Sequence, residues 1–173
     1  GRARLEGVVV SQVDESRVPI PGTERFFDCD TLLLSVGLIP ENELTRQAGV
    51  AIDPRTGGAV VYENMETAIP GVFACGNALH VHDLVDFVTA ESQRAGAAAA
   101  RFVRAGGGAG GPTLEVLPGE GVGYAVPQRI RPDRTEGSCS LFLRVDRVYG
   151  ESEMLVTSGG DILAAYRREH LAP

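Results

Sequence analysis

The sequence of 173 residues contains no lysine, and it has only three cysteines and three histidines. Without lysine, Schiff-base chemistry and lysine-dependent phosphate loops are excluded. No apolar run approaches the ~20 residues that a membrane-spanning helix needs, so we expect no membrane partner. The net charge is −7 and the arginines are scattered, which argues against nucleic acid as a partner.

The three cysteines, Cys29, Cys75 and Cys139, lie far apart and form no C-x-x-C motif. An odd number of separated cysteines favours reduced thiols, so we expect a cytoplasmic protein. Cys75 lies in an apolar segment with no other cysteine nearby in the sequence. We therefore expect it to be a packing residue rather than a redox thiol.

The first hundred residues alternate β-rich and helical patterns, which predicts an α/β fold. Short strands are expected at residues 5–13 and 26–29. The apolar runs 30–37 and 72–75 predict strands buried on both faces of a parallel sheet. Between them we expect a short helix at 41–48 and a hairpin around residues 54–58. A long helix is predicted from an N-cap at Asp86 to Arg104.

Residues 105–112 read AGGGAGGP, and five glycines in this window predict a flexible linker. Beyond the linker the pattern changes to short strands separated by turns, at residues 114–117, 122–126, 139–145, 154–157 and 162–167. This spacing predicts a small all-β, sandwich-like domain. The expected organisation is therefore residues 1–104, a linker at 105–112, and a β domain at 113–173.

Residues 67–77, TAIPGVFACGN, are the most informative stretch of the sequence. A turn leads into a short apolar strand that ends at Gly76-Asn77, and a helix is predicted soon after. Glycine lets the backbone approach a ligand closely, and a helix N-terminus favours negative charge. Asn77 can offer both a donor and an acceptor to a sugar hydroxyl.

Three other pieces precede this site in a fixed order: a strand that ends at Gly37, the sequence LIPEN at 38–42, and the T-x-x-P-G turn at 67–71. Over residues 25–104 the sequence resembles the FAD/NAD(P)-dependent pyridine nucleotide-disulfide oxidoreductase family. The resemblance implies part of a Rossmann-type FAD-binding domain, with FAD as cofactor and NAD(P)H as a substrate of the full-length parent. Asn77 stands where the family usually has an aspartate that holds a ribitol hydroxyl of the flavin.

The resemblance also implies which residues bind the cofactor, whereas it identifies no catalytic residue. The backbone amides of Phe87 and Val88 are expected to face the pyrimidine edge of the flavin, at the positive end of the predicted helix. The full set of expected cofactor-binding residues is Gly37, Gly76, Asn77, Asp86, Phe87 and Val88.

His80-Val81-His82 could place two imidazoles on one face of a strand, as some metal sites do. The sequence shows no third ligand, so we expect no metal site here. One of the two histidines could instead lie near the flavin and tune its potential or relay a proton, or both could be simple loop residues. On the following helix, Glu91, Gln93 and Arg94 are expected to form the solvated face or a domain contact.

No G-x-G-x-x-G motif follows a predicted strand, so the primary pyrophosphate loop and a nicotinamide site are not evident. We expect a fragment of an oxidoreductase that transfers hydride from NAD(P)H through FAD to an unidentified acceptor. The fragment alone is expected to be inactive and to bind FAD weakly or not at all. The alternative is a non-catalytic interaction module that docks a partner subunit. Unpaired strand edges predict a homo-oligomer in either case.

Overall fold

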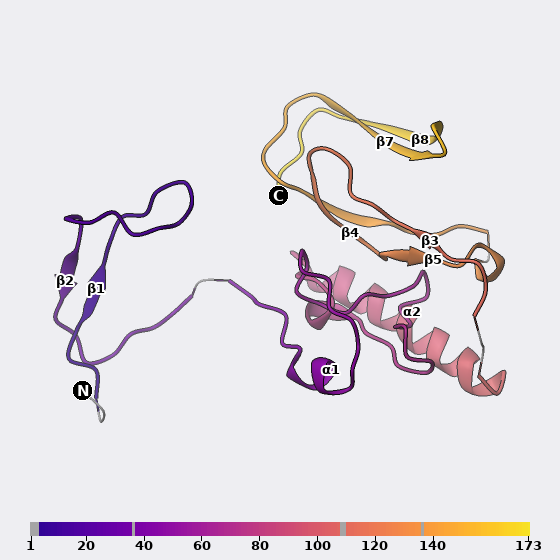
Figure 1. Ribbon diagram of the computed structural model, residues 1–173, viewed down its shortest axis with the longest axis horizontal. Coiled ribbons are helices and arrows are strands. Elements are labelled where there is room, and N and C mark those ends of the chain that lie inside the picture. Colours follow the sequence, from indigo (N-terminus) through magenta and orange to yellow (C-terminus); the bar gives the residue numbers. More distant parts are fainter. Residues whose placement is uncertain (1–3, 36, 108–109, 136) are drawn as a thin grey trace. The chain divides into compact units, whose positions relative to one another are not determined.

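The structure is a computed structural model that describes residues 4–35, 37–107, 110–135 and 137–173 (Figure 1). The chain forms two compact units, Gly1–Gly37 and Leu38–Pro173. The second unit includes residues on both sides of the glycine-rich segment. The predicted division into domains at residues 105–112 stays a prediction.

The first unit is built around one antiparallel pair of strands, β1 (Val8–Val10) and β2 (Arg25–Phe27). Val9 lies opposite Phe26 in this pair. In the intervening loop, the Asp14 carboxylate accepts hydrogen bonds from the backbone N–H groups of Ser16 and Val18. The pair confirms the two predicted strands, although each is shorter than the apolar pattern suggested.

The predicted buried strand at residues 30–37 is wrong for the residues that the structure describes, and Val36 lies outside them. This segment forms no strand, and the side chains of Leu33 and Leu34 are 90% and 73% exposed. A buried strand needs a neighbour on each side to satisfy its backbone groups. Within the described residues of the first unit, the named strands are β1 and β2, which pair with each other, so this apolar run has no sheet to join.

The second unit begins with α1 (Glu43–Gln47), which is closed by Gly49 at a φ of +78°. A hairpin follows, in which Ile52 lies opposite Ala59 and the N–H of Asp53 donates to the carbonyl of Gly58. The predicted short helix and hairpin are therefore confirmed. Both elements precede the segment that carries the candidate site.

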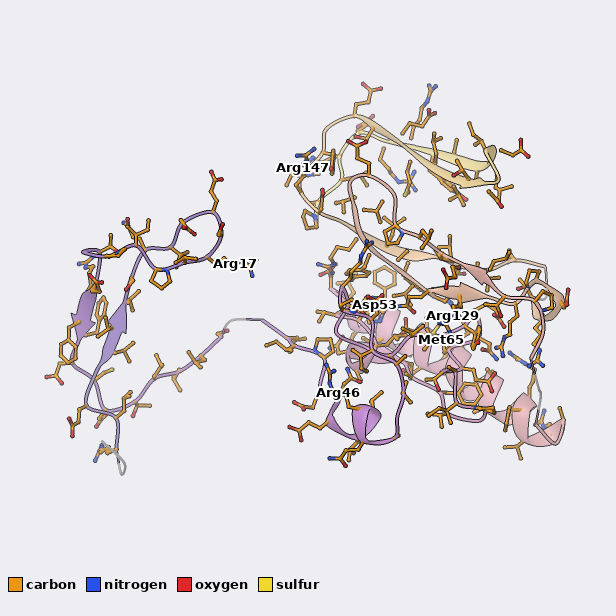
Figure 2. All side chains as sticks on the ribbon, viewed as in Figure 1. Arg17, Arg46, Asp53, Met65, Arg129 and Arg147 are labelled. Carbon is orange, nitrogen blue, oxygen red and sulfur yellow. The ribbon has the colours of Figure 1, made fainter. Side chains whose placement is uncertain are left out.

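Residues 72–75 do not form the predicted parallel strand. Phe73 makes an isolated antiparallel bridge with Glu66, and the N–H of Ala74 donates to the carbonyl of Met65. Met65, labelled in Figure 2, is fully buried at a φ of +71°. The segment thus folds back on its own preceding turn, because that turn supplies the backbone partners that a distant strand would otherwise provide.

The longest element is α2 (Val85–Arg104), which confirms the predicted helix. Its N-cap is Leu84 and not Asp86, which lies exposed in the first turn and makes no side-chain cap. Among the described residues, no helix has both the length and the apolar character needed to cross a membrane. α2 contributes Ala95 to a buried core whose other members are Val50, Ala59, Val61, Met65, Leu79 and Val126.

In its described residues, the chain after the glycine-rich segment forms three antiparallel strand pairs. They are β3 (Leu114–Glu115) with β5 (Arg129–Ile130), β4 (Val122–Val126) with β6 (Phe142–Val145), and β7 (Ser152–Ser158) with β8 (Asp161–Arg168). Five of these six strands were predicted from the sequence, and β5 was missed because two residues carry too short a pattern. The sandwich arrangement stays a prediction.

A buried arginine, Arg131, connects this β-rich part to the turn at residues 62–66. The N–H of Arg131 donates to Glu63, and its guanidinium bonds to Glu66 and Asn64, each at 2.8 Å. The guanidinium also lies 4.1 Å from the centre of the Tyr62 ring. Burial alone would lower the pKa of Arg131, but the bonds to Glu66 and Glu63 raise it above its ordinary value. The charge is therefore held in place by its partners.

We predict that Arg131→Met lowers the free energy of unfolding by about 3–5 kcal/mol, because two buried carboxylates lose their counter-charge. Arg167→Met is the matched control, since Arg167 is 84% exposed and pairs with Glu153 on the surface. The control change should cost less than about 1 kcal/mol. Urea unfolding followed by circular dichroism measures both. Equal losses in the two variants would contradict the role assigned to Arg131.

Candidate functional site

The predicted Gly76-Asn77 turn exists as the short 3-10 helix η1 (Gly76–Ala78), directly before the loop into α2. Gly76 is buried and has a φ of +68°, a conformation that other residues rarely adopt. A Cβ atom at this position would lie 3.4 Å from Cγ1 of Val88. The structure therefore brings two of the predicted cofactor-binding residues, Gly76 and Val88, close together.

Asn77 is exposed, and its carboxamide organises the loop that follows η1. Its Oδ1 accepts the backbone N–H of His82 at 3.1 Å. Among the described residues, its Nδ2 group has no hydrogen-bond partner and remains able to donate. The side chain thus has a structural bond on one atom and a free donor on the other.

The other predicted cofactor-binding residues, Asp86, Phe87 and Gly37, are all exposed. Asp86 and Phe87 lie exposed in the first turn of α2, and the N–H of Phe87 donates to the carbonyl of Leu84 at 3.2 Å. The first N–H groups of an α-helix usually have no acceptor within the helix and can bind a ligand. The amide of Phe87 is an exception, because it already donates to Leu84. Gly37 belongs to the first unit, where it is exposed at a φ of +99°. The cofactor roles of these residues stay predictions.

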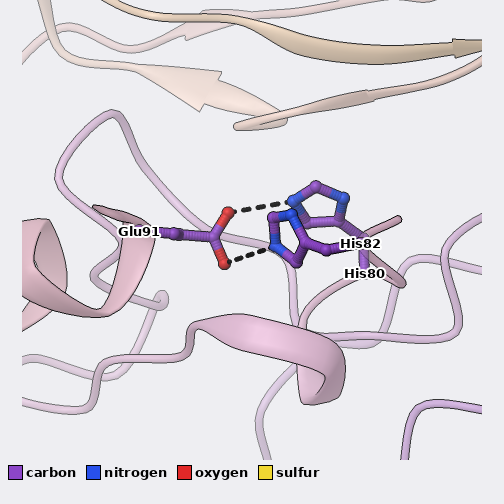
Figure 3. Close-up of side chains that lie close together, drawn as sticks. All are labelled: His80, His82 and Glu91. Atoms are coloured by element: carbon purple, nitrogen blue, oxygen red, sulfur yellow. Dashed lines mark hydrogen bonds and ion pairs between the residues drawn. The ribbon is translucent and has the colours of Figure 1, made fainter. Parts of the chain in front are cut away.

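A histidine pair and a buried glutamate meet beside the turn (Figure 3). Nε2 of His80 lies 2.9 Å from Oε2 of Glu91, and Nε2 of His82 lies 3.3 Å from Oε1. The N–H of Gly76 donates to Oε1 at 2.6 Å. We call His80, His82 and Glu91 the His–Glu cluster. Its three potential ligand atoms all lie within 4.8 Å of one another, so these residues could hold a metal ion.

The carboxylate of Glu91 is completely buried, yet it stays ionised because of its partners. Burial by itself would raise the pKa of Glu91. The bonds from His80, from the Gly76 N–H and from His82 outweigh burial and lower the pKa below its ordinary value of 4.5. An ionised carboxylate only accepts hydrogen bonds, so both imidazoles donate Nε2–H to it.

Aromatic rings close one side of the His–Glu cluster. The ring of His80 lies 4.1 Å from that of His82 and 5.8 Å from those of both Tyr124 and Phe142. A cavity of about 150 Å³ is lined by the two histidines, Phe87, Tyr124, Phe142 and neighbouring residues. Nδ1 of His80 is buried without a hydrogen-bond partner among the described residues. The cluster therefore borders a space that could hold a small polar ligand.

The expectation that Glu91 lies on the solvated face of α2 is wrong, since its side chain is 0% exposed. Glu91 occupies the same helical stripe as Val88, Ala95, Ala98 and Phe102, at spacings of three and four residues. That spacing was the available signal for its burial. Charge alone suggested a surface position, because an isolated carboxylate is costly to bury.

The sequence that forms this site matches a known protein family. Residues 4–109, more than half of the chain, match the family model described as pyridine nucleotide-disulphide oxidoreductase. No solved structure matches the chain. The matched region includes η1, the His–Glu cluster and the whole of α2.

We predict that Glu91→Gln lowers the free energy of unfolding by about 1–3 kcal/mol at pH 7, because a buried charge-assisted network is lost. The folded protein holds the pKa of Glu91 below 4.5, so the unfolded chain binds more protons in acid. The contribution of Glu91 is thus present above about pH 4.5 and is lost as the pH falls through the folded-state value.

Urea unfolding at pH 7, 5 and 4 measures this effect, with the exposed Glu153→Gln as control. The acid-induced loss of stability should be smaller in Glu91→Gln than in the parent and unchanged in the control. An identical pH dependence in the parent and Glu91→Gln would show that Glu91 is not held ionised by its partners.

Proposed function

Because the chain belongs to the pyridine nucleotide-disulphide oxidoreductase family, we propose that it forms part of a flavin-dependent oxidoreductase that moves hydride from NAD(P)H to FAD and on to an acceptor. The observation that carries the proposal is the family match across residues 4–109. FAD, when bound, supplies the two-electron chemistry, and the protein supplies binding and orientation.

The turn at Gly76 fits a role in holding a flavin. Its φ of +68° strains any residue other than glycine, and a Cβ atom here would already lie 3.4 Å from Cγ1 of Val88, so the backbone runs close to the first turns of α2. The exposed Asn77 carboxamide can donate Nδ2–H to a sugar hydroxyl while Oδ1 keeps its bond to His82. These features support the cofactor roles inferred for Gly76 and Asn77.

The N-terminus of α2 supports the proposal electrostatically. Its positive end favours negative charge on a bound group, and the exposed Asp86 in the first turn partly offsets that field. The side chain of Phe87, which lies in the same turn, lines the cavity beside the histidines. This position supports a contact between the Phe87 side chain and a bound ring, whereas its amide donates to the carbonyl of Leu84.

Glu91 supports the same turn as a positioning residue. It accepts the N–H of Gly76 at 2.6 Å from the second turn of α2, which links the turn to the helix across fifteen positions of sequence. A turn fixed at both ends loses little conformational entropy when a ligand binds. We infer that this link keeps the turn ready for the cofactor.

A second candidate function is a non-catalytic module that docks a partner subunit. The observation that favours it is a run of exposed large apolar side chains in the first unit, where Leu32 is 49%, Leu33 is 90% and Leu34 is 73% exposed. Such side chains are typical of surfaces that another protein covers. A purified protein that carries no flavin and co-purifies with another polypeptide would favour this candidate.

We predict that Asn77→Leu weakens FAD binding by roughly 1–3 kcal/mol, because it removes the polar contacts to the sugar. Asn77→Asp should be tolerated, since it still accepts both the His82 N–H and a sugar hydroxyl. The 173-residue chain itself should bind FAD weakly. The measurement is the amount of FAD that each variant retains after gel filtration. Both substitutions are made in the longest natural polypeptide that contains these residues.

Asn77→Asp serves as the matched control for folding, since it preserves the bond to His82. Circular dichroism should show the same helix content in the parent and both variants. If Asn77→Leu retains as much FAD as the parent, then Gly76-Asn77 is only a turn and the assignment of this site fails.

A further inference from the structure

We propose that His80, His82 and Glu91 form a binding site for a divalent transition metal ion, with Zn²⁺ the best match. The site goes beyond the proposed flavin chemistry and does not depend on it. Two imidazole nitrogens and a carboxylate oxygen converge here from the loop after η1 and from the second turn of α2 (Figure 3).

The distances suit ligands that surround one ion. Zinc bonds to histidine nitrogen and carboxylate oxygen are about 2.0–2.2 Å long, so tetrahedral ligands lie roughly 3.3–3.6 Å apart. The two histidine–glutamate separations are 2.9 and 3.3 Å, and all three atoms fall within 4.8 Å. Small adjustments of the side chains would accommodate an ion at their centre.

The ligand set also selects the kind of metal. Imidazole nitrogens favour zinc and its transition-metal neighbours, whereas calcium and magnesium prefer oxygen ligands. Two histidines and one glutamate are a known zinc ligand set that leaves a fourth position open. The cavity of about 150 Å³ is lined by both histidines, so a water molecule or a small ligand could fill that fourth position.

Metal binding needs the lone pairs of both Nε2 atoms, which now donate hydrogen bonds to Glu91. An imidazole that carries its single proton on Nε2 frees this nitrogen when the proton moves to Nδ1 by exchange with water. Nδ1 of His80 has no competing partner among the described residues, and the ring borders the cavity. The rearrangement therefore leaves the number of protons on the imidazoles unchanged and breaks no other hydrogen bond of His80.

Several surrounding contacts hold the ligands in place before an ion arrives. The Gly76 N–H fixes one carboxylate oxygen of Glu91, and Asn77 fixes the backbone of His82. The carboxamide of Asn42 donates to the carbonyl of Ala78 at 2.8 Å, which anchors the end of η1. Outer contacts of this kind orient metal ligands and raise the affinity of a site.

The test is metal binding by the tag-free 173-residue chain, freed of metal by chelator and titrated with Zn²⁺ in a calorimeter. We expect one ion per chain. His80→Gln and His82→Gln should each weaken binding at least about 100-fold, more than the loss of an outer contact. His170→Gln is the matched control, because it removes the remaining histidine, which is exposed, and should leave the affinity unchanged.

Titration of the unaltered chain with Co²⁺ tests the same proposal without any variant, so it remains decisive if a substitution impairs folding. A strong visible absorption of four-coordinate Co²⁺, removed by added Zn²⁺, is expected. Absence of both Zn²⁺ binding and this absorption would overturn the proposal and leave the cluster as a hydrogen-bonded network. Binding that is lost equally in His170→Gln would also overturn it.

Discussion

The buried carboxylate of Glu91 is the interaction on which the candidate site depends. It accepts hydrogen bonds from the Gly76 backbone and from the rings of His80 and His82, and it is fully excluded from solvent. A buried ion without such partners would cost several kcal/mol. The geometry of the turn, the loop and the helix is therefore coupled through a single side chain.

Arg131 is a second buried charge that hydrogen-bonded partners stabilise. Its guanidinium connects the β-rich part of the chain to the turn at residues 62–66. The apolar core of this unit is small, and alanines supply much of the face that α2 buries. Ionic networks with full hydrogen bonding give such a core a specific arrangement that small side chains alone do not specify. The Arg131 network holds residues 62–66, and Glu91 holds the turn at Gly76.

The sequence predicted the elements whose stability is local. The helix at 85–104 and the strand at 122–126 were foreseen, because alanine spacing and β-branched residues act within each segment. The apolar run at 30–37 was misjudged, because a buried strand depends on neighbours elsewhere in the chain. The pattern indicated the turn at Gly76-Asn77. The apolar spacing around Glu91 also indicated burial, but its charge suggested a surface position, because the histidine partners that compensate the buried carboxylate reach it only in the folded chain.

The most direct test of this coupling is a long-range ¹H–¹⁵N correlation spectrum of the histidine ring nitrogens in the parent and in Glu91→Gln. The account predicts that the rings of His80 and His82 both have a protonated Nε2 in the parent. Both should change together in Glu91→Gln, while the exposed His170 stays the same. Ring signals of His80 and His82 that match His170 and ignore the substitution would contradict the account.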